Sequence, residues 1–192
     1  MTIDDAIENY YTLLAQGQEL FDRPNTGGQR RAIAGRLFEQ LASDLVACTD
    51  RSLSKGRFIR SREIEGISLP RLQVDKHIEH NGAIESVCEC KTYLDFCYYK
   101  RAISDFKEVL LSPDTSDVVK LAVFTGQRSL DDNSLEFANA LSRQETGVTP
   151  GLFVVNTVKQ RYSSKQLCDP QYASDFDLDV SELQRFIDWV SE

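Results

Sequence analysis

The stretch from Leu72 to Lys91, LQVDKHIEHNGAIESVCECK, constrains the fold most strongly because it has the pattern of two strands joined by a tight turn. The first run alternates between apolar and polar residues, and the second is rich in β-branched and thiol side chains. Asn81-Gly82 lies between them, and this dipeptide between two such runs is the strongest short-range signal for a β-hairpin. The sequence therefore predicts a hairpin in which residues whose numbers sum to about 163 or 164 lie opposite each other.

Three charged residues occupy matching positions on this hairpin. Asp75 lies early in the first strand, whereas Glu89 and Lys91 lie at the end of the second, spaced by two and therefore on one face of the sheet. The predicted pairing brings Asp75 next to Cys88 or Glu89, although 14 positions separate the two acids. Mg²⁺ usually binds one or two carboxylates plus waters and substrate phosphates. A neighbouring lysine can orient or deprotonate the attacking water, or stabilise charge in the transition state. The alternative is a Glu-x-Lys pair on a solvated strand face.

An Asp followed by a hairpin turn and then Glu-x-Lys resembles the active-site motif of the PD-(D/E)xK nuclease superfamily, which includes most type II restriction endonucleases. Val74 stands before Asp75, where proline is common in the superfamily. The resemblance implies that Asp75 and Glu89 bind Mg²⁺, with Mn²⁺ as a substitute, and that Lys91 acts on the nucleophilic water.

The segment Gly35-Arg36-Leu37-Phe38-Glu39 is similar to the first core helix of many restriction endonucleases, which carries a glutamate that joins the active site. Glu39 is therefore the fourth candidate catalytic residue. The alternative for Glu39 is an exposed position on a helix surface.

Hydrophobic periodicity along the chain predicts helix, helix, strand, hairpin, helix, buried strand, helix, buried strand, helix. The predicted helices cover 3–21, 29–48, 93–111, 130–143 and 181–190, and the predicted strands outside the hairpin lie within 57–64, 118–125 and 152–158. This order predicts an α/β fold with a mixed central sheet flanked by helices, and the αβββαβ core of restriction endonucleases is similar to it. We expect one domain over 1–192. Residues 1–28 would form a helix and loop for packing or dimerisation, 29–161 the catalytic core, and 162–192 a closing loop and helix.

The net charge of −8 argues at first against nucleic acid as a partner. Net charge is a global sum, however, whereas DNA binding depends on the local charge of a surface patch. Residues 51–71 hold six basic and two acidic side chains, a local charge of +4, and Arg57, Arg60 and Arg62 are candidate phosphate contacts. A second candidate DNA-facing edge follows the two buried strands and comprises Gln127, Arg128, Lys159 and Arg161. For any single arginine, a solvated strand face is the alternative.

Five cysteines, three of them close together, do not form the pattern of a disulfide framework. No apolar run has the length of a membrane span, and the acidic N-terminus lacks the pattern of a signal peptide, so we expect no membrane partner and a cytoplasmic location.

The residues and the resemblance together lead us to expect a Mg²⁺-dependent, sequence-specific endonuclease of double-stranded DNA, a type II restriction enzyme that acts as a homodimer. A repair or junction-resolving nuclease of the same fold remains an alternative. A non-catalytic binding protein with the nuclease fold is the alternative from a different functional class.

Overall fold

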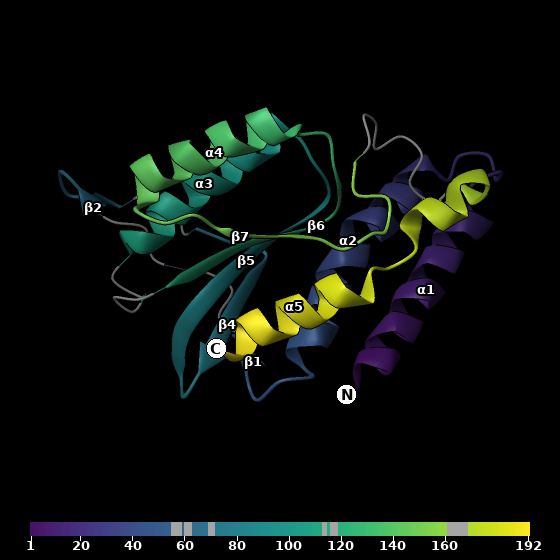
Figure 1. Ribbon diagram of the computed structural model, residues 1–192, viewed down its shortest axis with the longest axis horizontal. Coiled ribbons are helices and arrows are strands. Elements are labelled where there is room, and N and C mark those ends of the chain that lie inside the picture. The colour runs from purple at the N-terminus through teal and green to yellow at the C-terminus, as the bar shows by residue number, and fades with distance from the viewer. Residues whose placement is uncertain (55–58, 60–62, 69–71, 113–114, 116–118, 161–168) are drawn as a thin grey trace.

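The computed structural model, which describes residues 1–54, 59, 63–68, 72–112, 115, 119–160 and 169–192, has a mixed sheet between two layers of helices (Figure 1). The strand order is β1-β4-β5-β6-β7, in which β1, β4 and β5 pair antiparallel and β5, β6 and β7 pair parallel. These strands are Ser52–Leu53, Lys76–His80, Ala83–Leu94, Lys120–Arg128 and Gly151–Val154. The predicted α/β fold with a mixed, helix-flanked sheet is confirmed.

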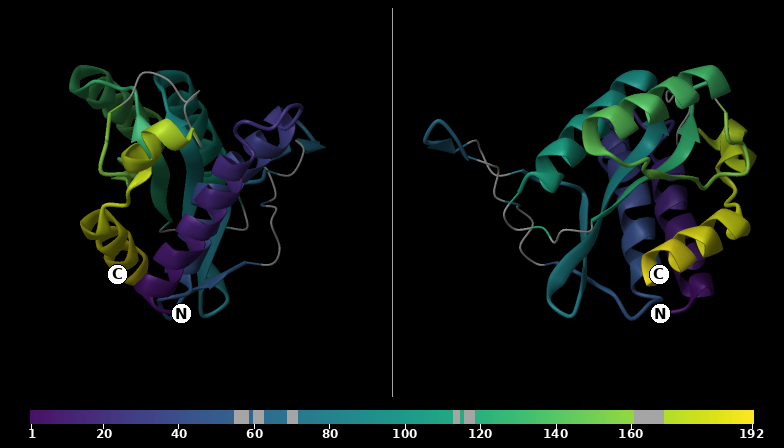
Figure 2. Two further views of the ribbon diagram at one scale, coloured as in Figure 1. Left: turned by 90° about the vertical axis from the view of Figure 1, so that its right-hand side faces the viewer. Right: turned by 60° about the vertical axis from the view of Figure 1, so that its left-hand side comes forward.

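The helices form one layer on each face of the sheet, as Figures 1 and 2 show. On one face lie α1 (Ile3–Glu19), α2 (Gly27–Val46) and α5 (Val180–Ser191), and on the other lie α3 (Phe96–Leu110) and α4 (Asp132–Thr146). Each helix layer packs on the sheet through its own hydrophobic core, and the side chains of β5 alternate between these two cores. Cys88 and Cys90 lie in the first core and Val87 lies in the second. In the described part of the chain, no helix has both the length and the hydrophobicity needed to cross a bilayer.

The β4–β5 hairpin turns at the predicted position. Asn81 and Gly82 have φ angles of 52° and 83°, and a type I′ turn requires positive φ at both central residues. Near the turn, His80 pairs with Ala83, and beyond a register shift Lys76 pairs with Cys88. Both predicted sums, 163 and 164, therefore occur within the hairpin, one on each side of the irregularity.

Helix α3 begins at Phe96 rather than at the predicted Tyr93. Strand β5 continues to Leu94, and Asp95 then caps the helix by accepting a hydrogen bond from the backbone N–H of Tyr98 at 2.8 Å. The four-residue spacing of Tyr98, Ala102 and Phe106 predicts that Tyr98 faces the core. That prediction was wrong, because Tyr99 is fully buried whereas Tyr98 is 47% exposed.

The strand predicted within 57–64 differs from the structure. Ile59 forms an isolated antiparallel bridge with Leu72, and 57–58 and 60–62 lie outside the described residues. Residues Glu63–Ile64 form β2, which pairs with β3 (Ile67–Ser68) in a separate hairpin that projects from the body (Figure 2). The first strand of the main sheet is instead β1, which has only two residues and therefore no readable periodicity.

Two further differences lie toward the C-terminus. Strand β7 ends at Val154, four residues before the predicted end at Val158. A 3₁₀ helix, η2 (Pro170–Phe176), forms in a segment predicted to be a loop. Phe176 of this helix is buried in the same core as α1 and α2. Tertiary packing therefore orders a segment that has no strong local pattern.

Candidate active site

The hairpin register places Asp75 against the end of β5. Lys76, the first residue of β4, pairs with Cys88, so Asp75 lies one position further along, beside Glu89. Its Oδ2 atom accepts a hydrogen bond from the backbone N–H of Cys90 at 2.8 Å. This bond fixes the carboxylate against the backbone of β5, between the two residues whose side chains carry the predicted charges.

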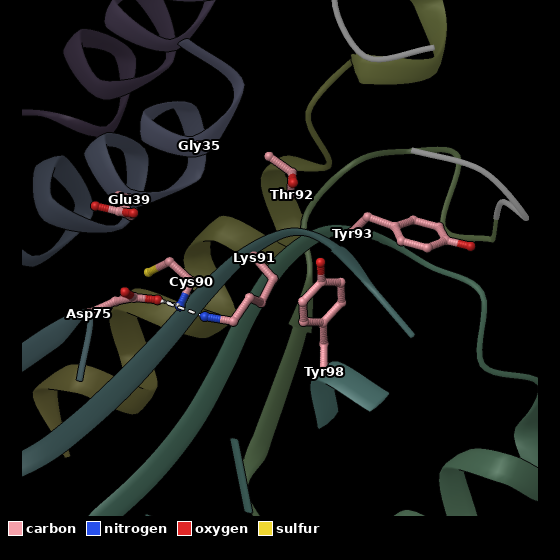
Figure 3. Close-up of a pocket in the computed structure, with 8 residues that line it drawn as sticks. All are labelled: Gly35, Glu39, Asp75, Cys90, Lys91, Thr92, Tyr93 and Tyr98. Atoms are coloured by element: carbon pink, nitrogen blue, oxygen red, sulfur yellow. Dashed lines mark hydrogen bonds and ion pairs between the residues drawn. The ribbon is translucent and has the colours of Figure 1, made fainter. Parts of the chain in front are cut away.

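Lys91 joins the two acids. Its Nζ lies 3.0 Å from Asp75 Oδ2, and the same ammonium group donates to Glu89 Oε2 (Figure 3 draws the contact with Asp75). The structure therefore brings together the three residues that the motif predicted, Asp75, Glu89 and Lys91. The two carboxylates converge on a single positive group although they are far apart in sequence.

Burial perturbs the proton affinity of this group. Glu89 is 5% exposed, and burial, reinforced by the neighbouring Asp75 carboxylate, raises the pKa of Glu89 to about 7 despite the opposing effect of Lys91. Burial lowers the pKa of Lys91, but the adjacent Glu89 and Asp75 carboxylates outweigh that effect and hold its pKa above its usual range. At neutral pH, Lys91 is therefore an ammonium ion in the metal-free protein.

Glu39 faces the same site from α2. It lines a cavity of about 230 Å³ together with Gly35, Asp75 and Lys91, and Figure 3 shows its carboxylate on the side of the cavity nearest Asp75. Glu39 is half-buried, and its pKa is raised by burial and by the charge of Asp75. The structure thus brings the fourth predicted catalytic residue to the cavity that Asp75 and Lys91 also line, whereas Glu89 is not among its lining residues.

The carboxylate oxygens of Asp75 and Glu89 are suitable ligands for a hard divalent cation that retains part of its water shell. Among the described residues, no three His, Cys, Asp or Glu side chains are grouped closely enough to form a complete protein cage. Mg²⁺ does not need such a cage, since one or two carboxylates plus waters and substrate oxygens suffice. Oxygens of Asp75 and Glu89 both contact Lys91 Nζ, so they lie within reach of one small cation once that ammonium moves aside.

The residues predicted to contact DNA lie in different settings. Arg57, Arg60, Arg62 and Arg161 lie outside the described residues. Gln127 is 4% exposed and donates to the backbone oxygen of Asp175 at 3.0 Å, so its amide is directed into the protein. A side chain in this position cannot read a base edge unless it leaves that hydrogen bond.

Arg128 and Lys159 do lie near each other, since both line a second cavity of about 200 Å³ that shares no residue with the first. Their charges are already engaged within the protein. Arg128 donates to Leu130 O and to Asp132, at 2.7 and 2.8 Å, and Lys159 donates to Val154 O and pairs with Asp179, at 2.6 and 2.7 Å. Their contact with DNA stays a prediction.

Sequence reasoning did not identify several residues around the candidate site. Thr92 and Tyr93 line the first cavity (Figure 3). Tyr98 also lines it and belongs to the run from Tyr98 to Arg101, for which the sequence predicts either a nucleic-acid face or, more commonly, a helix boundary layer. Asp105 of α3 is half-buried, and burial raises its pKa, with a smaller contribution from Asp75. Recognising Asp95 as the helix cap would have moved the predicted start of α3 to Phe96.

The chain matches no family model, no curated protein and no solved structure in the three comparisons made. The resemblance to the nuclease superfamily therefore rests on the motif residues and on the order of the elements.

Proposed function

We propose that this protein is a Mg²⁺-dependent DNA endonuclease that hydrolyses phosphodiester bonds. The observation that carries the proposal is the convergence of Asp75 and Glu89 on the ammonium of Lys91, beside a cavity that Asp75, Lys91 and Glu39 line. The elements that build this site follow in the order α2, β1, β4, β5, α3, β6, with β2 and β3 as a separate hairpin. This order supports the αβββαβ core that the motif implies.

Each charged residue has a chemical role in such a reaction. Asp75 and Glu89 would hold the cation through their carboxylate oxygens. A divalent cation, when bound, supplies Lewis-acid activation of the phosphodiester and of a water molecule. Lys91, charged at neutral pH, would donate hydrogen bonds to the attacking water or to the phosphate oxygens as negative charge develops there. Glu39 would accept a hydrogen bond from water in the cavity.

The same chemistry fits two kinds of DNA enzyme. The sequence resemblance implies a type II restriction enzyme that cuts double-stranded DNA, and a symmetric double-strand cut would require a homodimer. A repair or junction-resolving nuclease is the second form, and the exposed Tyr98 ring in the cavity favours it. A non-catalytic binding protein would not need Asp75, Glu89 and Lys91 together.

The direct test is to incubate plasmid and phage DNA with the purified protein and Mg²⁺, alongside Lys91→Ala and a metal-free control. Discrete fragments from the wild type alone would support a restriction enzyme, and mapping their ends would give the site and stagger. Random products that require both Mg²⁺ and Lys91 would support a repair or structure-directed nuclease. Absence of cleavage with both Mg²⁺ and Mn²⁺, across single-stranded and forked as well as duplex DNA of many sequences, would refute the proposed activity.

A further inference from the structure

The cavity has an aromatic wall opposite its charged wall. Tyr98, in the first turn of α3, lines the cavity beside Lys91 and Tyr93, as Figure 3 shows. The backbone of Tyr98 is held by the Asp95 cap, whereas its side chain is 47% exposed. A rigid backbone therefore presents a large, solvent-exposed ring a short distance from the candidate catalytic group.

Contacts among the described residues do not account for the exposed tyrosine ring at position 98. Its neighbour Tyr99 is fully buried and donates its hydroxyl hydrogen to Asn139 at 2.7 Å. Within the described part of the chain, Tyr98 forms no ring–ring contact and its hydroxyl has no hydrogen bond. An aromatic face that is both exposed and fixed next to a phosphodiester site is suited to stacking on a nucleobase.

A free positive charge lies on the same helix. Arg101 follows Tyr98 by three residues, so the two side chains lie on one face of α3. It is exposed and, within the described residues, forms no hydrogen bond or ion pair, although its charge acts on Asp105. An aromatic ring together with a cation is the combination with which proteins bind single strands, by stacking bases and attracting the backbone.

The described residues around the second cavity provide few free positive charges for binding the phosphates of a duplex. A duplex binder neutralises several phosphates with lysine and arginine side chains. Arg128, Lys159 and Arg185 gather at that cavity, but each donates to a backbone oxygen and to a carboxylate within the protein. Free charge in this part of the structure therefore does not form a wide phosphate-binding track.

The size of the first cavity also favours a single strand over a duplex as the ligand. At about 230 Å³, it is smaller than the roughly 300–1,000 Å³ typical of pockets that enclose drug-sized ligands. A cavity of this size can accept one base against the ring of Tyr98. A strand whose base is already unpaired enters such a site without the cost of unstacking and unpairing.

We propose that the site acts on a DNA strand that is unpaired at the scissile phosphate, with the adjacent base stacked on Tyr98 and a neighbouring phosphate held by Arg101. The substrate class is thus a single strand, or the single-stranded branch of a forked or flapped duplex. This inference rests on the proposed function, since it names the substrate of the same cavity.

The test is a binding titration of the full chain in metal-free buffer, with fluorescently labelled single-stranded DNA and with a blunt duplex of the same sequence. We expect the single strand to bind more tightly than the duplex. Tyr98→Ala should weaken single-strand binding about 5- to 150-fold, which corresponds to about 1–3 kcal/mol of base stacking. Tyr98→Phe should retain the affinity, because stacking uses the ring and not the hydroxyl.

Phe137→Ala is the matched control, because Phe137 is a 61%-exposed aromatic side chain of α4 that does not line the cavity. It should bind like the wild type. Arg101→Gln should reduce the salt dependence of binding by roughly one phosphate contact. In Tyr98→Trp, single-stranded DNA should quench the new tryptophan signal, a readout that does not require a loss of affinity.

Equal or tighter binding of the blunt duplex would overturn the inference, as would wild-type affinity in Tyr98→Ala together with no quenching in Tyr98→Trp. These outcomes differ from a failure of the proposed function. If the binding pattern holds but Mg²⁺ produces no cleavage of the forked substrate, the substrate class stands and the hydrolytic activity is refuted.

Discussion

Replacing Glu89 by glutamine should change how the stability of the metal-free protein depends on pH. Glu89 is 5% exposed, and its folded-state pKa is raised from 4.5 to about 7. The unfolded chain therefore loses this proton at lower pH than the folded chain does. The stability associated with protonated Glu89 is complete below about pH 4.5 and is lost as the pH rises through about 7.

The pKa difference sets the size of the effect. At about 1.4 kcal/mol for each pH unit, a rise from 4.5 to about 7 corresponds to about 3 kcal/mol. Glutamine has nearly the same shape and no charge, and Lys91 keeps its ion pair with Asp75. The free energy of unfolding of Glu89→Gln, relative to wild type, should therefore increase by about 3 kcal/mol between pH 4.5 and pH 8.

The assay is urea unfolding with a metal chelator, followed by circular dichroism at several pH values between 4.5 and 8. Glu136→Gln is the matched control, because Glu136 is exposed on α4 and forms no ion pair within the described residues. Its difference from wild type should stay constant with pH. The reasoning would be refuted if Glu89→Gln also showed a constant difference, or if it lost relative stability as the pH rose.

Four further substitutions test local features of the fold. Gly126→Ala should destabilise the protein by about 1–3 kcal/mol in urea unfolding, because its Cβ would lie closer than 3.0 Å to the buried ring of Phe38. Gly35→Ala, whose Cβ would have nothing within 4 Å, should instead stabilise the protein by about 0.5–1 kcal/mol. Gly82→Ala should cost about 1–2 kcal/mol in the same assay, because the turn requires φ of 83°, and a neutral result would contradict the type I′ turn. Asp179→Ala should cost about 1 kcal/mol at pH 7 through loss of the α5 cap. Hydrogen bonds from Lys159 and Ser181 lower the pKa of Asp179 to about 2, so this difference should shrink as the pH falls from 3.8 toward 2, and a pH-independent difference would contradict the assigned contacts.

Local chemistry explains why the hairpin could be predicted. Asn81-Gly82 determines the turn type, the turn sets the register, and the register determines that Asp75 faces the end of β5. The turn and the register next to it require no knowledge of the rest of the fold, whereas the register shift between Ile78 and Glu79, which brings Asp75 beside Glu89, is not signalled by the Asn-Gly dipeptide. The spacing of Glu89 and Lys91 then places both side chains on one face, and the contacts of Asp75 with Lys91 follow.

The phase of α3 could not be predicted as reliably because two adjacent tyrosines fit the hydrophobic stripe. The four-residue spacing through Ala102 and Phe106 selected Tyr98, whereas Tyr99 fits the same stripe at a spacing of three. Packing in the core that α3 shares with the sheet decides between them, and Tyr99 is buried there in one cluster with Val123 of β6. That contact is remote in sequence and leaves no local signal.

Tertiary contacts likewise determine the environment of the polar residues that follow β6. Glutamine is a residue type that can read bases, but the 3₁₀ helix η2 supplies the Asp175 backbone oxygen to which the Gln127 amide donates. The partner lies 48 residues away. Burial of a polar side chain by such a distant segment depends on the packing of η2, which hydrophobic periodicity does not reveal.

Calorimetric titration with Mn²⁺ is the decisive measurement for a cation site formed by Asp75 and Glu89. The account predicts that Mn²⁺ binds the wild-type chain and the Glu136→Gln control alike. Asp75→Asn should weaken that binding by about tenfold or more. No Mn²⁺ binding by the wild type, or equal affinity in Asp75→Asn, would contradict the assignment of this site and with it the proposed hydrolysis.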